Sequence, residues 1–258
     1  MEKPKYFIVE FMEDMLSDWS FSEFKQMYYY LSRHSGNVLI LTNTGVLKTF
    51  EDDESKDNLE QFGEFLDEKR SEIFWLLEKP LFTYLNKDTG VLELSQFYSL
   101  GKNQPTQNLQ LPLDRICLLD MRGESILRSE ETKIFDAYLF GGILGDHPPR
   151  DRTFTLREQF KHRRRLHTTQ MSTDTALLVT QMIVEEKWEL EKIPFTENPE
   201  LANPEDPDNT VSMEGFVYVT NKYDMETGKL RNVNVEEPIM SDTIKNTLLF
   251  MDFDFNLM

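Results

Sequence analysis

Apolar and polar positions alternate along this chain in two periods, which predict strands and helices in turn. Apolar runs at residues 6–11 and 38–41 are typical of buried strands. Between them, Ser20-Phe-Ser-Glu23 matches a capping box, and apolar residues repeat at helical spacing to about Ser32. A strand, a helix and a strand in this order predict a parallel pair joined by a right-handed crossover.

The same alternation resumes in the second half of the chain. Further strands are expected at 115–119, 135–140 and 166–169. Helices are expected to begin at a second capping box, Thr155-Leu-Arg-Glu158, and at Ser172. The first of these helices would carry the basic run Lys161-His-Arg-Arg-Arg165. The repeated order predicts an α/β domain with a parallel sheet over residues 1–195.

Two segments depart from this pattern and carry much of the negative charge. Residues 51–72 contain ten acids and three bases, and an amphipathic helix is expected from about Asp57 to Leu77. Residues 196–258 contain 13 acids and 4 bases, a net of 4 − 13 = −9, half of the −18 of the whole chain. We interpret 51–110 as an acidic insertion within the domain and 196–258 as an acidic C-terminal extension after a Pro-rich linker.

The composition narrows the classes of protein that fit. Of the 258 residues, 39% are hydrophobic, which is enough for a folded core. The net charge of −18 disfavours binding to a nucleic-acid backbone and favours a basic partner or simple solubility. The single cysteine, Cys117, excludes an internal disulfide and is typical of a reducing compartment. Without an apolar run that could span a membrane or a signal peptide, a cytoplasmic protein is expected.

One strand end carries a glycine-rich segment that could bind a ligand. The strand at 135–140 continues into Gly141-Gly-Ile-Leu-Gly145, followed by Asp146. This segment lacks the Gly-Lys-Ser/Thr of a nucleoside-triphosphate loop and the Gly-x-Gly-x-x-Gly of a dinucleotide site. It suits a flat heterocycle held by backbone groups and apolar walls, although a plain turn after the strand would explain the same glycines.

Two other strand ends carry polar residues. Asp120 follows one strand and could contact a ligand or act as an acid or base, and it could equally cap a helix or form a turn. In Gln170-Met-Ser-Thr-Asp-Thr175, Ser172 or Thr173 can cap the next helix, with Asp174 complementing its positive end. The alternative is that this loop faces the glycine segment across a ligand.

Three segments are distinctive enough for comparison with known families. They are Leu118-Leu-Asp120, Phe140-Gly-Gly-Ile-Leu-Gly-Asp-His-Pro-Pro-Arg150 and Gln170-Met-Ser-Thr-Asp-Thr-Ala-Leu-Leu-Val179. In these segments the chain resembles the small archaeal and fungal branch of the SPOUT methyltransferases, and within it the fungal protein arginine N-methyltransferases that act on a small-subunit ribosomal protein. The resemblance covers 1–50 and 111–195. It implies a C-terminal deep trefoil knot, which general topology rules would not predict.

The resemblance also implies a cofactor, a reaction and site residues. The cofactor would be S-adenosylmethionine, with S-adenosylhomocysteine as product, and a methyl group would pass to an arginine of a basic ribosomal protein. Carried over by position, the cofactor-binding residues are Leu119, Asp120, Met121, Phe140, Gly141, Gly142, Ile143, Leu144, Gly145, Gln170, Met171, Ser172 and Thr175. The candidate catalytic carboxylates, which would hold the guanidinium, are Asp146, Asp174, Glu10 and Glu13. Asp146 ranks first because it directly follows the glycine segment, and each of the four could instead be a turn or cap residue.

The distribution of charge bears on the substrate. The acids in 51–72 and 196–258 would repel RNA and attract an arginine-bearing protein segment. Residues 150–165, with seven bases and two acids, could contact rRNA, form a solvated face or pair with the acidic insertion of the same molecule. An RNA methyltransferase and a non-catalytic escort of a basic ribosomal protein are therefore the alternatives. His147 and His162 lack partners at metal-ligand spacing, so no metal site is expected.

A monomer is also expected. SPOUT proteins usually dimerise through the helices of the knot. The acidic insertion and the C-terminal extension could cover that face in this chain.

Overall fold

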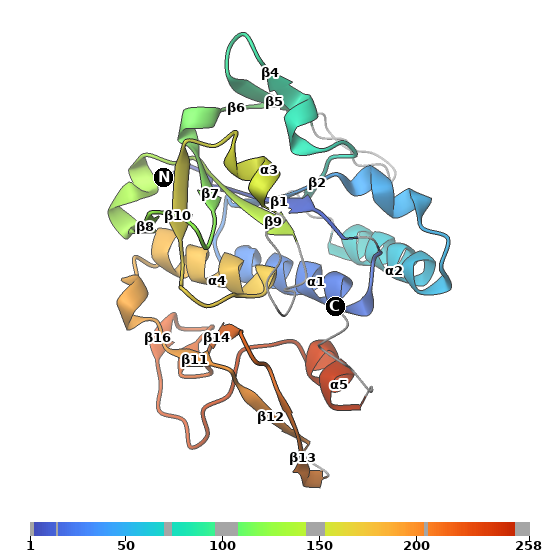
Figure 1. Cartoon of the computed structure of the whole chain (residues 1–258), viewed down its shortest axis with the longest axis vertical. Coiled ribbons are helices and arrows are strands. Elements are labelled where there is room, and N and C mark those ends of the chain that lie inside the picture. Colours follow the sequence, from blue (N-terminus) through green and yellow to red (C-terminus); the bar gives the residue numbers. More distant parts are fainter. Residues whose placement is uncertain are drawn as a thin grey trace.

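The protein was analysed as a computed structural model, which describes residues 3–13, 15–69, 74–95, 108–142, 153–203 and 206–250. Its centre is a seven-stranded sheet in which all neighbouring strands run parallel (Figure 1). In spatial order, the strands are β3 (Phe74–Leu76), β2 (Val38–Thr42), β1 (Tyr6–Phe11), β9 (Ala137–Gly142), β7 (Ile116–Leu119), β10 (His162–Arg165) and β8 (Ser125–Ile126). The α/β class with a parallel sheet is confirmed.

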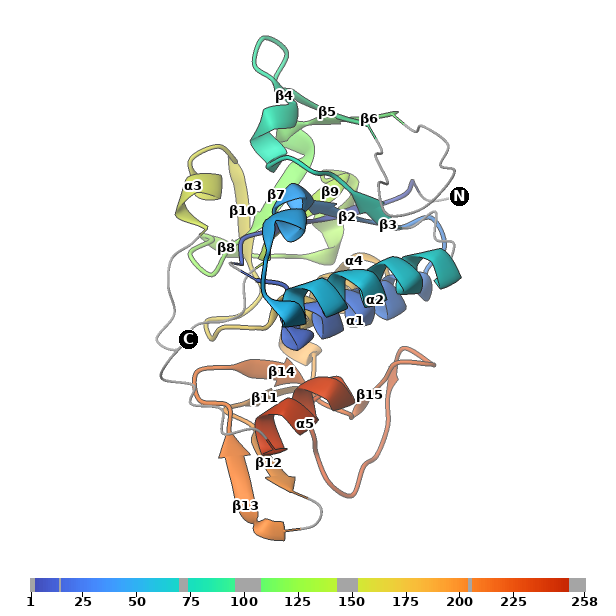
Figure 2. The same cartoon turned by 90° about the vertical axis from the view of Figure 1, so that its right-hand side faces the viewer.

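Long helices cover one face of this sheet (Figure 2). They are α1 (Asp18–Ser32), α2 (Asp53–Lys69) and α4 (Thr173–Val184). Phe7, Val9 and Phe11 of β1 point into this layer, whereas Ile8 points into the opposite one. The strands therefore read as nearly continuous apolar runs, because both faces of the sheet are buried.

Shorter elements cover the other face. A three-stranded antiparallel sheet contains β4 (Leu85–Asn86), β5 (Val91–Ser95) and β6 (Asn108–Pro112), and the short helix α3 (Phe154–Arg157) lies beside it (Figure 2). The 3₁₀ turns are η1 (Thr44–Thr49), η2 (Leu81–Tyr84), η3 (Leu113–Arg115), η4 (Ser129–Lys133) and η5 (Leu190–Lys192). The antiparallel sheet, α3, η2 and η3 bury a second apolar cluster against this face, whereas Leu47 of η1 and Leu190 of η5 belong to the cluster on the helical face. No helix in the described ranges is both long and apolar enough to cross a membrane.

The expected bounds of two helices were wrong. The acidic helix begins at Asp53 and ends at Lys69, and the apolar residues after it form the edge strand β3 rather than a continuation of the helix. Three apolar residues pair better with β2 than they would extend a helical stripe, because β2 offers an open edge. The first helix begins at Asp18 rather than in the capping box, and Ser17 is its N-cap, accepting a hydrogen bond from the backbone of Ser20.

The placement of the basic run on a helix was also wrong. His162–Arg165 is strand β10, between β7 and β8, and no strand follows at 166–169. The helix predicted from the second capping box is limited to α3. A strand of arginines is stable here because their charges meet acids and carbonyl groups of neighbouring segments, which the local sequence does not reveal.

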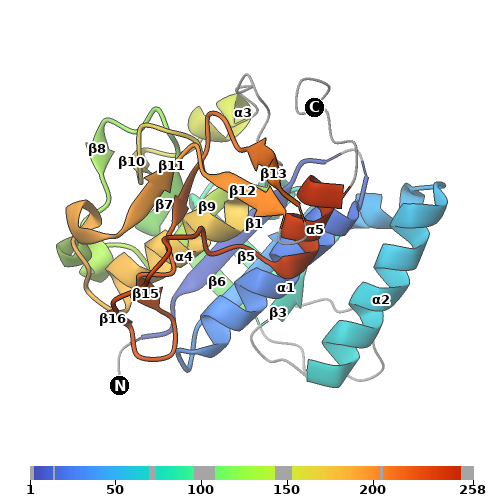
Figure 3. The ribbon, with the colours of Figure 1, turned by 90° about the horizontal axis from the view of Figure 1, so that it is seen from below.

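The C-terminal extension packs on α1 and α4, on the side away from the sheet (Figure 3). Its elements are β11 (Phe195–Glu197), β12 (Glu200–Asn203), β13 (Asp206–Ser212), β14 (Val217–Val219), β15 (Tyr223–Asp224), β16 (Lys229–Leu230) and α5 (Asp242–Phe250). It has an apolar cluster of its own, in which Phe216, Tyr218 and Ile244 surround Trp19 of α1. Trp19 is therefore shared between the domain and the extension.

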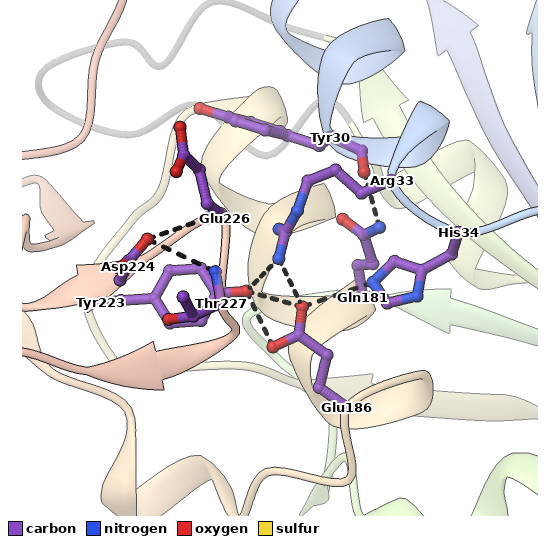
Figure 4. Close-up of polar contacts among 9 residues, drawn as sticks. All are labelled: Tyr30, Arg33, His34, Gln181, Glu186, Tyr223, Asp224, Glu226 and Thr227. Atoms are coloured by element: carbon purple, nitrogen blue, oxygen red, sulfur yellow. Dashed lines mark hydrogen bonds and ion pairs between the residues drawn. The ribbon is translucent and has the colours of Figure 1, made fainter.

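Hydrogen bonds and an ion pair join the extension to the C-terminal ends of α1 and α4 (Figure 4). The Tyr223 hydroxyl donates to the carboxylate of Glu186, 2.6 and 2.7 Å from its two oxygens. Arg33 Nη2 donates to both groups, 2.9 Å from Glu186 Oε1 and 2.8 Å from the Tyr223 hydroxyl. Burial raises the pKa of Tyr223, and the bond to Glu186 raises it further, so the phenol stays neutral.

Candidate functional site

The residues expected to bind a ligand gather at one edge of the sheet. Leu119 ends β7 and Phe140 lies near the end of β9, and both are buried. Because β9, β7 and β10 are neighbours and run parallel, their carboxyl ends lie side by side. Met121, just beyond β7, is 43% exposed and Met171 is partly buried. Ile143, Leu144, Gly145 and Asp146 lie outside the described residues.

Close approach between strands explains one glycine of the glycine-rich segment. A Cβ on Gly142 would lie 2.6 Å from Val9 Cγ1 and 2.7 Å from the carbonyl oxygen of Glu10. Gly141 and Gly142 both belong to β9 and neither has positive φ. The glycine at 142 is thus required by the contact of β9 with β1, whatever else this edge binds.

Asp120 forms a buried ion pair. Its Oδ2 accepts from Arg157 Nε at 2.6 Å, and its Oδ1 accepts from Arg157 Nη2 at 3.2 Å and from the backbone N–H of Arg122 at 3.1 Å. The Asp120 side chain is 2% exposed and that of Arg157 is 12% exposed. Asp120 therefore holds α3 against the end of β7, and a cofactor contact by Asp120 stays a prediction.

The loop before α4 joins the sheet edge to the extension. The carbonyl oxygen of Gln170 accepts from the backbone N–H of Val217 at 2.8 Å. Ser172 is the N-cap residue of α4, and its hydroxyl donates to Thr175 Oγ1 at 2.8 Å rather than capping a backbone group. Asp174 lies in the first turn, 2% exposed, and its Oδ1 has no hydrogen-bond partner among the described residues.

A small pocket, with a cavity volume of about 10 Å³, lies between this edge of the sheet and the helices. Its lining residues are Phe11, Glu13, Ser20, Glu23, Phe24, Met27, Gly142 and Thr173. The pocket thus lies at the carboxyl ends of β1 and β9, between α1 and the start of α4. It brings Glu13 close to Asp174, because Thr173 of its wall directly precedes Asp174.

The structure places Glu10 elsewhere. Its carboxylate accepts hydrogen bonds from the Thr42 hydroxyl and from the backbone N–H of Leu81, the latter at 3.1 Å. Leu81 belongs to the apolar cluster on the opposite face of the sheet from the pocket. Burial raises the pKa of Glu10 despite these two bonds. We therefore leave Glu10 out of the site and interpret it as an anchor for η2.

Glu23 is a site residue that the sequence analysis missed. It is 4% exposed, and it accepts hydrogen bonds from Trp19 Nε1, at 2.9 Å, and from the backbone N–H of Asp174. Its position in a capping box suggested only a role in starting the helix. The available signal was a glutamate among the apolar positions of an amphipathic helix, four residues after a tryptophan.

The pKa values of both buried acids are raised. Burial raises the pKa of Glu23 well above its usual range, and the neighbouring Asp174 and Glu13 raise it further. Burial also raises the pKa of Asp174 to about 6, although hydrogen bonds from Ser172 and from backbone N–H groups oppose the rise. Two carboxyl groups in this setting hold a proton that a bound cation would displace.

The basic run of β10 is engaged inside the molecule. Arg164 forms an ion pair with Glu131, whose two oxygens lie 2.9 and 3.0 Å from Arg164 Nε. Arg165 Nη1 donates to the carbonyl oxygens of Gly123 and Glu124 at 2.9 and 3.0 Å. Glu131, Gly123 and Glu124 all lie outside the acidic insertion at 51–110, so these contacts differ from the expected pairing with that insertion. Among those residues, no group of three or more His, Cys, Asp or Glu is arranged to hold a metal ion.

Comparison with known proteins gives a consistent match. A family profile described as "Protein arginine N-methyltransferase SFM1-like" matches residues 6–248. Protein arginine N-methyltransferase SFM1 of Saccharomyces cerevisiae is 45% identical over 105 residues, which cover 39% of this chain and 49%, or about half, of that relative.

Solved structures agree over a greater length. Yeast arginine methyltransferase SFM1 complexed with SAM has a TM-score of 0.64 and 28% identity, covering 96% of this chain and 91% of that one. The same enzyme complexed with SAH has a TM-score of 0.62 and 27% identity, covering 95% and 94%. The resemblance to fungal arginine methyltransferases is confirmed.

Proposed function

This chain belongs to the SFM1-like family of protein arginine N-methyltransferases, and on that basis we propose that it transfers a methyl group from S-adenosylmethionine to an arginine side chain of a protein. One observation carries the proposal. A pocket lined by Glu13 and Glu23, with Asp174 behind its wall, adjoins the edge of the sheet where the expected cofactor residues gather. A guanidinium cation with five N–H donors suits a site of three carboxylates.

The chemistry of the acceptor follows from the groups in the pocket. S-adenosylmethionine, when bound, supplies an electrophilic methyl group. A guanidinium nitrogen forms the new N–C bond as the S–C bond breaks, S-adenosylhomocysteine leaves, and one proton is lost from that nitrogen. Glu23 or Asp174 can accept the proton, and the pKa of about 6 at Asp174 suits a base that works near neutral pH. Holding the guanidinium in line with the methyl group supplies much of the catalysis.

The cofactor would lie against the ends of β7 and β9 and the loop before α4. Leu119 at the end of β7, Phe140 near the end of β9, Gln170 and the start of α4 are the described residues and elements that would adjoin it. The engagement of the Asp120 carboxylate with Arg157 leaves the backbone of this strand end, rather than the carboxylate, to contact the cofactor. Asp146 and the residues 143–145 keep their proposed roles from the family resemblance.

The order of the strands supports the proposed knot. β7 and β8 follow each other in the chain, yet β10 lies between them in the sheet, so the segment joining β7 to β8 crosses β10. The crossing is close, since a Cβ on Gly123 would lie 2.6 Å from the carbonyl carbon of Arg164. A trefoil knot forms when the end of the chain passes through such a loop.

The proposed substrate is a basic, ribosomal protein, and the enzyme is proposed to act as a cytoplasmic monomer. The acidic face of α2 and the net charge of −18 favour a basic partner. The free, buried thiol of Cys117 suits a reducing compartment. The extension covers α1 and α4, which would otherwise be open for self-association (Figure 3). A stable dimer in light scattering would contradict the monomer.

A transfer assay tests the proposed function. The protein is incubated with methyl-labelled S-adenosylmethionine and two basic peptides that differ only by arginine or lysine at one position. Label in N-methylarginine from the arginine peptide alone is the expected result. With a whole extract as acceptor, label that nuclease removes would favour an RNA methyltransferase, and tight binding of the basic partner without label would favour the escort.

A further inference from the structure

Two buried tyrosines face the acid pair from behind the pocket. The hydroxyl groups of Tyr30, on α1, and Tyr218, on β14, are inaccessible to solvent and make no hydrogen bond of normal geometry with other described residues. Asp174 Oδ1 shares this condition. Buried polar groups without partners are uncommon in folded proteins, so three of them together call for an explanation.

Helix geometry brings Tyr30 to the acids. Tyr30 lies two turns after Glu23 on α1, and side chains on a helix lean toward its N-terminus, so the hydroxyl reaches back toward Glu23. The amide of Gln181 donates to the carbonyl oxygen of Tyr30 at 2.6 Å, which fixes this turn of α1 beside α4 (Figure 4). Glu23 and Asp174 both act electrostatically on the Tyr30 hydroxyl and raise its pKa further than burial does alone.

Tyr218 reaches the same acids from the extension. The strand start at Val217 is tied to Gln170, two residues before the α4 N-cap, by a backbone hydrogen bond of 2.8 Å. The Tyr218 ring stacks on Phe216, with 6.3 Å between centroids, in the cluster that also holds Trp19. Its hydroxyl faces Ser172, and Asp174 and Glu23 are again the charges that raise its pKa beyond the effect of burial.

We infer that Tyr30 and Tyr218 are positioning residues for the acids: each hydroxyl donates a hydrogen bond to Glu23 or Asp174 when a substrate guanidinium binds and the acids ionise. This rests on the proposed function. It makes the C-terminal extension, through Tyr218, part of the arginine site rather than a surface appendage.

A requirement for ionisation of the acids would explain why the buried hydroxyls of Tyr30 and Tyr218 make no normal hydrogen bond in this structure. A carboxyl group that keeps its proton offers a weaker acceptor than a carboxylate does, so the hydroxyls gain partners only on ionisation. The groups that act on the acids or on the two tyrosines come from every element packed there. They are Glu13 after β1, Trp19 and Tyr30 on α1, Arg33 at the C-cap of α1, which acts on Tyr30, Ser172 before α4 and Tyr218 on β14. Among the described residues in this set, Tyr30 and Tyr218 are the ones whose buried hydroxyls make no hydrogen bond of normal geometry, and the hydroxyl of Tyr218 interacts with Ser172.

The test is the pH dependence of kcat/KM for an arginine peptide. Loss of a donor destabilises the ionised acids, so Tyr218→Phe and Tyr30→Phe should each move the acidic limb upward by about one pH unit. For a limb that starts at the pKa of about 6 of Asp174, activity should then fall about fivefold at pH 6 and stay close to the wild-type value at pH 8.5. Tyr223→Phe is the matched control, because it removes a hydroxyl of the same extension that binds Glu186 and Arg33 instead. The Tyr223→Phe variant should lower the melting temperature and leave the acidic limb of the pH profile of kcat/KM unchanged.

A second measurement does not depend on methyl transfer. The melting temperature of the cofactor-free protein, followed from pH 5 to 9, reports ionisation of the acid pair, and Tyr218→Phe should shift that profile upward as well. The inference would be overturned if neither the melting profile nor the acidic limb of kcat/KM moved, or if activity fell equally at pH 6 and 8.5. Either result would leave the proposed methyltransferase function standing. Absence of arginine methylation by the wild-type protein would instead refute the proposed function, and the melting profile would still decide the role of the tyrosines.

Discussion

The backbone N–H of Asp174 donates to the carboxylate of Glu23, which joins the start of α4 to α1 where both acids are buried. One buried carboxylate held by hydrogen bonds can be stable. Two neighbouring buried carboxylates, such as those of Glu23 and Asp174, repel each other when both are ionised. The pair therefore costs stability at neutral pH, which is expected where a site is built for a cation.

The stability of the protein should show this cost. The pKa of Asp174 is raised from 3.8 in the unfolded chain to about 6 in the fold, so its favourable contribution is complete below pH 3.8 and is lost as the pH rises through 6. Asp174→Asn removes this dependence. Between pH 4.5 and pH 8, the free energy of unfolding of Asp174→Asn should gain about 2 kcal/mol relative to that of the wild type. Urea unfolding of both proteins at the two pH values measures this change. A difference between variant and wild type that is the same at both pH values would contradict the prediction.

The structure separates two glutamates of the β1 strand end by function. Glu13 lines the pocket, so Glu13→Gln should lower methyl transfer to an arginine peptide, by about tenfold if one charge-assisted hydrogen bond to the guanidinium is weakened. Glu10 is bonded to Thr42 and Leu81 on the other face, and the amide of Glu10→Gln can still accept from both. That variant should keep wild-type kcat/KM. Steady-state assays of both proteins decide, and equal losses would refute the assignment of the pocket.

The sequence was sufficient to predict elements whose pattern lies within the element itself. Apolar runs located most strands of the sheet, and the ends of β7 and β9, two of the strand ends expected to bind a ligand, do lie side by side, whereas the expected strand at 166–169 is absent. It was insufficient where a partner comes from far along the chain. Arg164 lies in a strand because Glu131 neutralises it, and Glu23 is buried because Asp174 and Trp19 supply its hydrogen bonds. The short strand β3 was hidden because Ile73 and Leu77, which flank it in the sequence, continue the helical period of α2.

The buried ion pair between Asp120 and Arg157 should be worth more than a surface pair. Arg157→Met leaves the Asp120 carboxylate buried without its cation and should cost about 3 kcal/mol or more. Asp120→Asn combined with Arg157→Met removes both charges and should recover part of that loss. The control is Lys48→Met, whose partner Glu78 is about half exposed, and it should cost less than about 1 kcal/mol. Chemical unfolding of the four proteins measures these terms, and equal losses for both lysine and arginine variants would contradict the assignment.

Two glycines of opposite environment test why β9 needs Gly142. A methyl group at 142 would lie 2.6 Å from Val9 Cγ1 and 2.7 Å from the Glu10 carbonyl oxygen, so β9 and β1 must separate. Gly142→Ala should therefore destabilise the protein by about 1–3 kcal/mol, the range typical of overpacked cores. Gly63 lies within α2 with nothing within 4 Å of an added Cβ, so Gly63→Ala should stabilise by about 0.5–1 kcal/mol. If Gly142 instead mattered only for the cofactor, Gly142→Ala would unfold like wild type and lose only affinity for S-adenosylhomocysteine. Melting curves with and without that product, compared for the two variants, distinguish a strand contact from a cofactor contact.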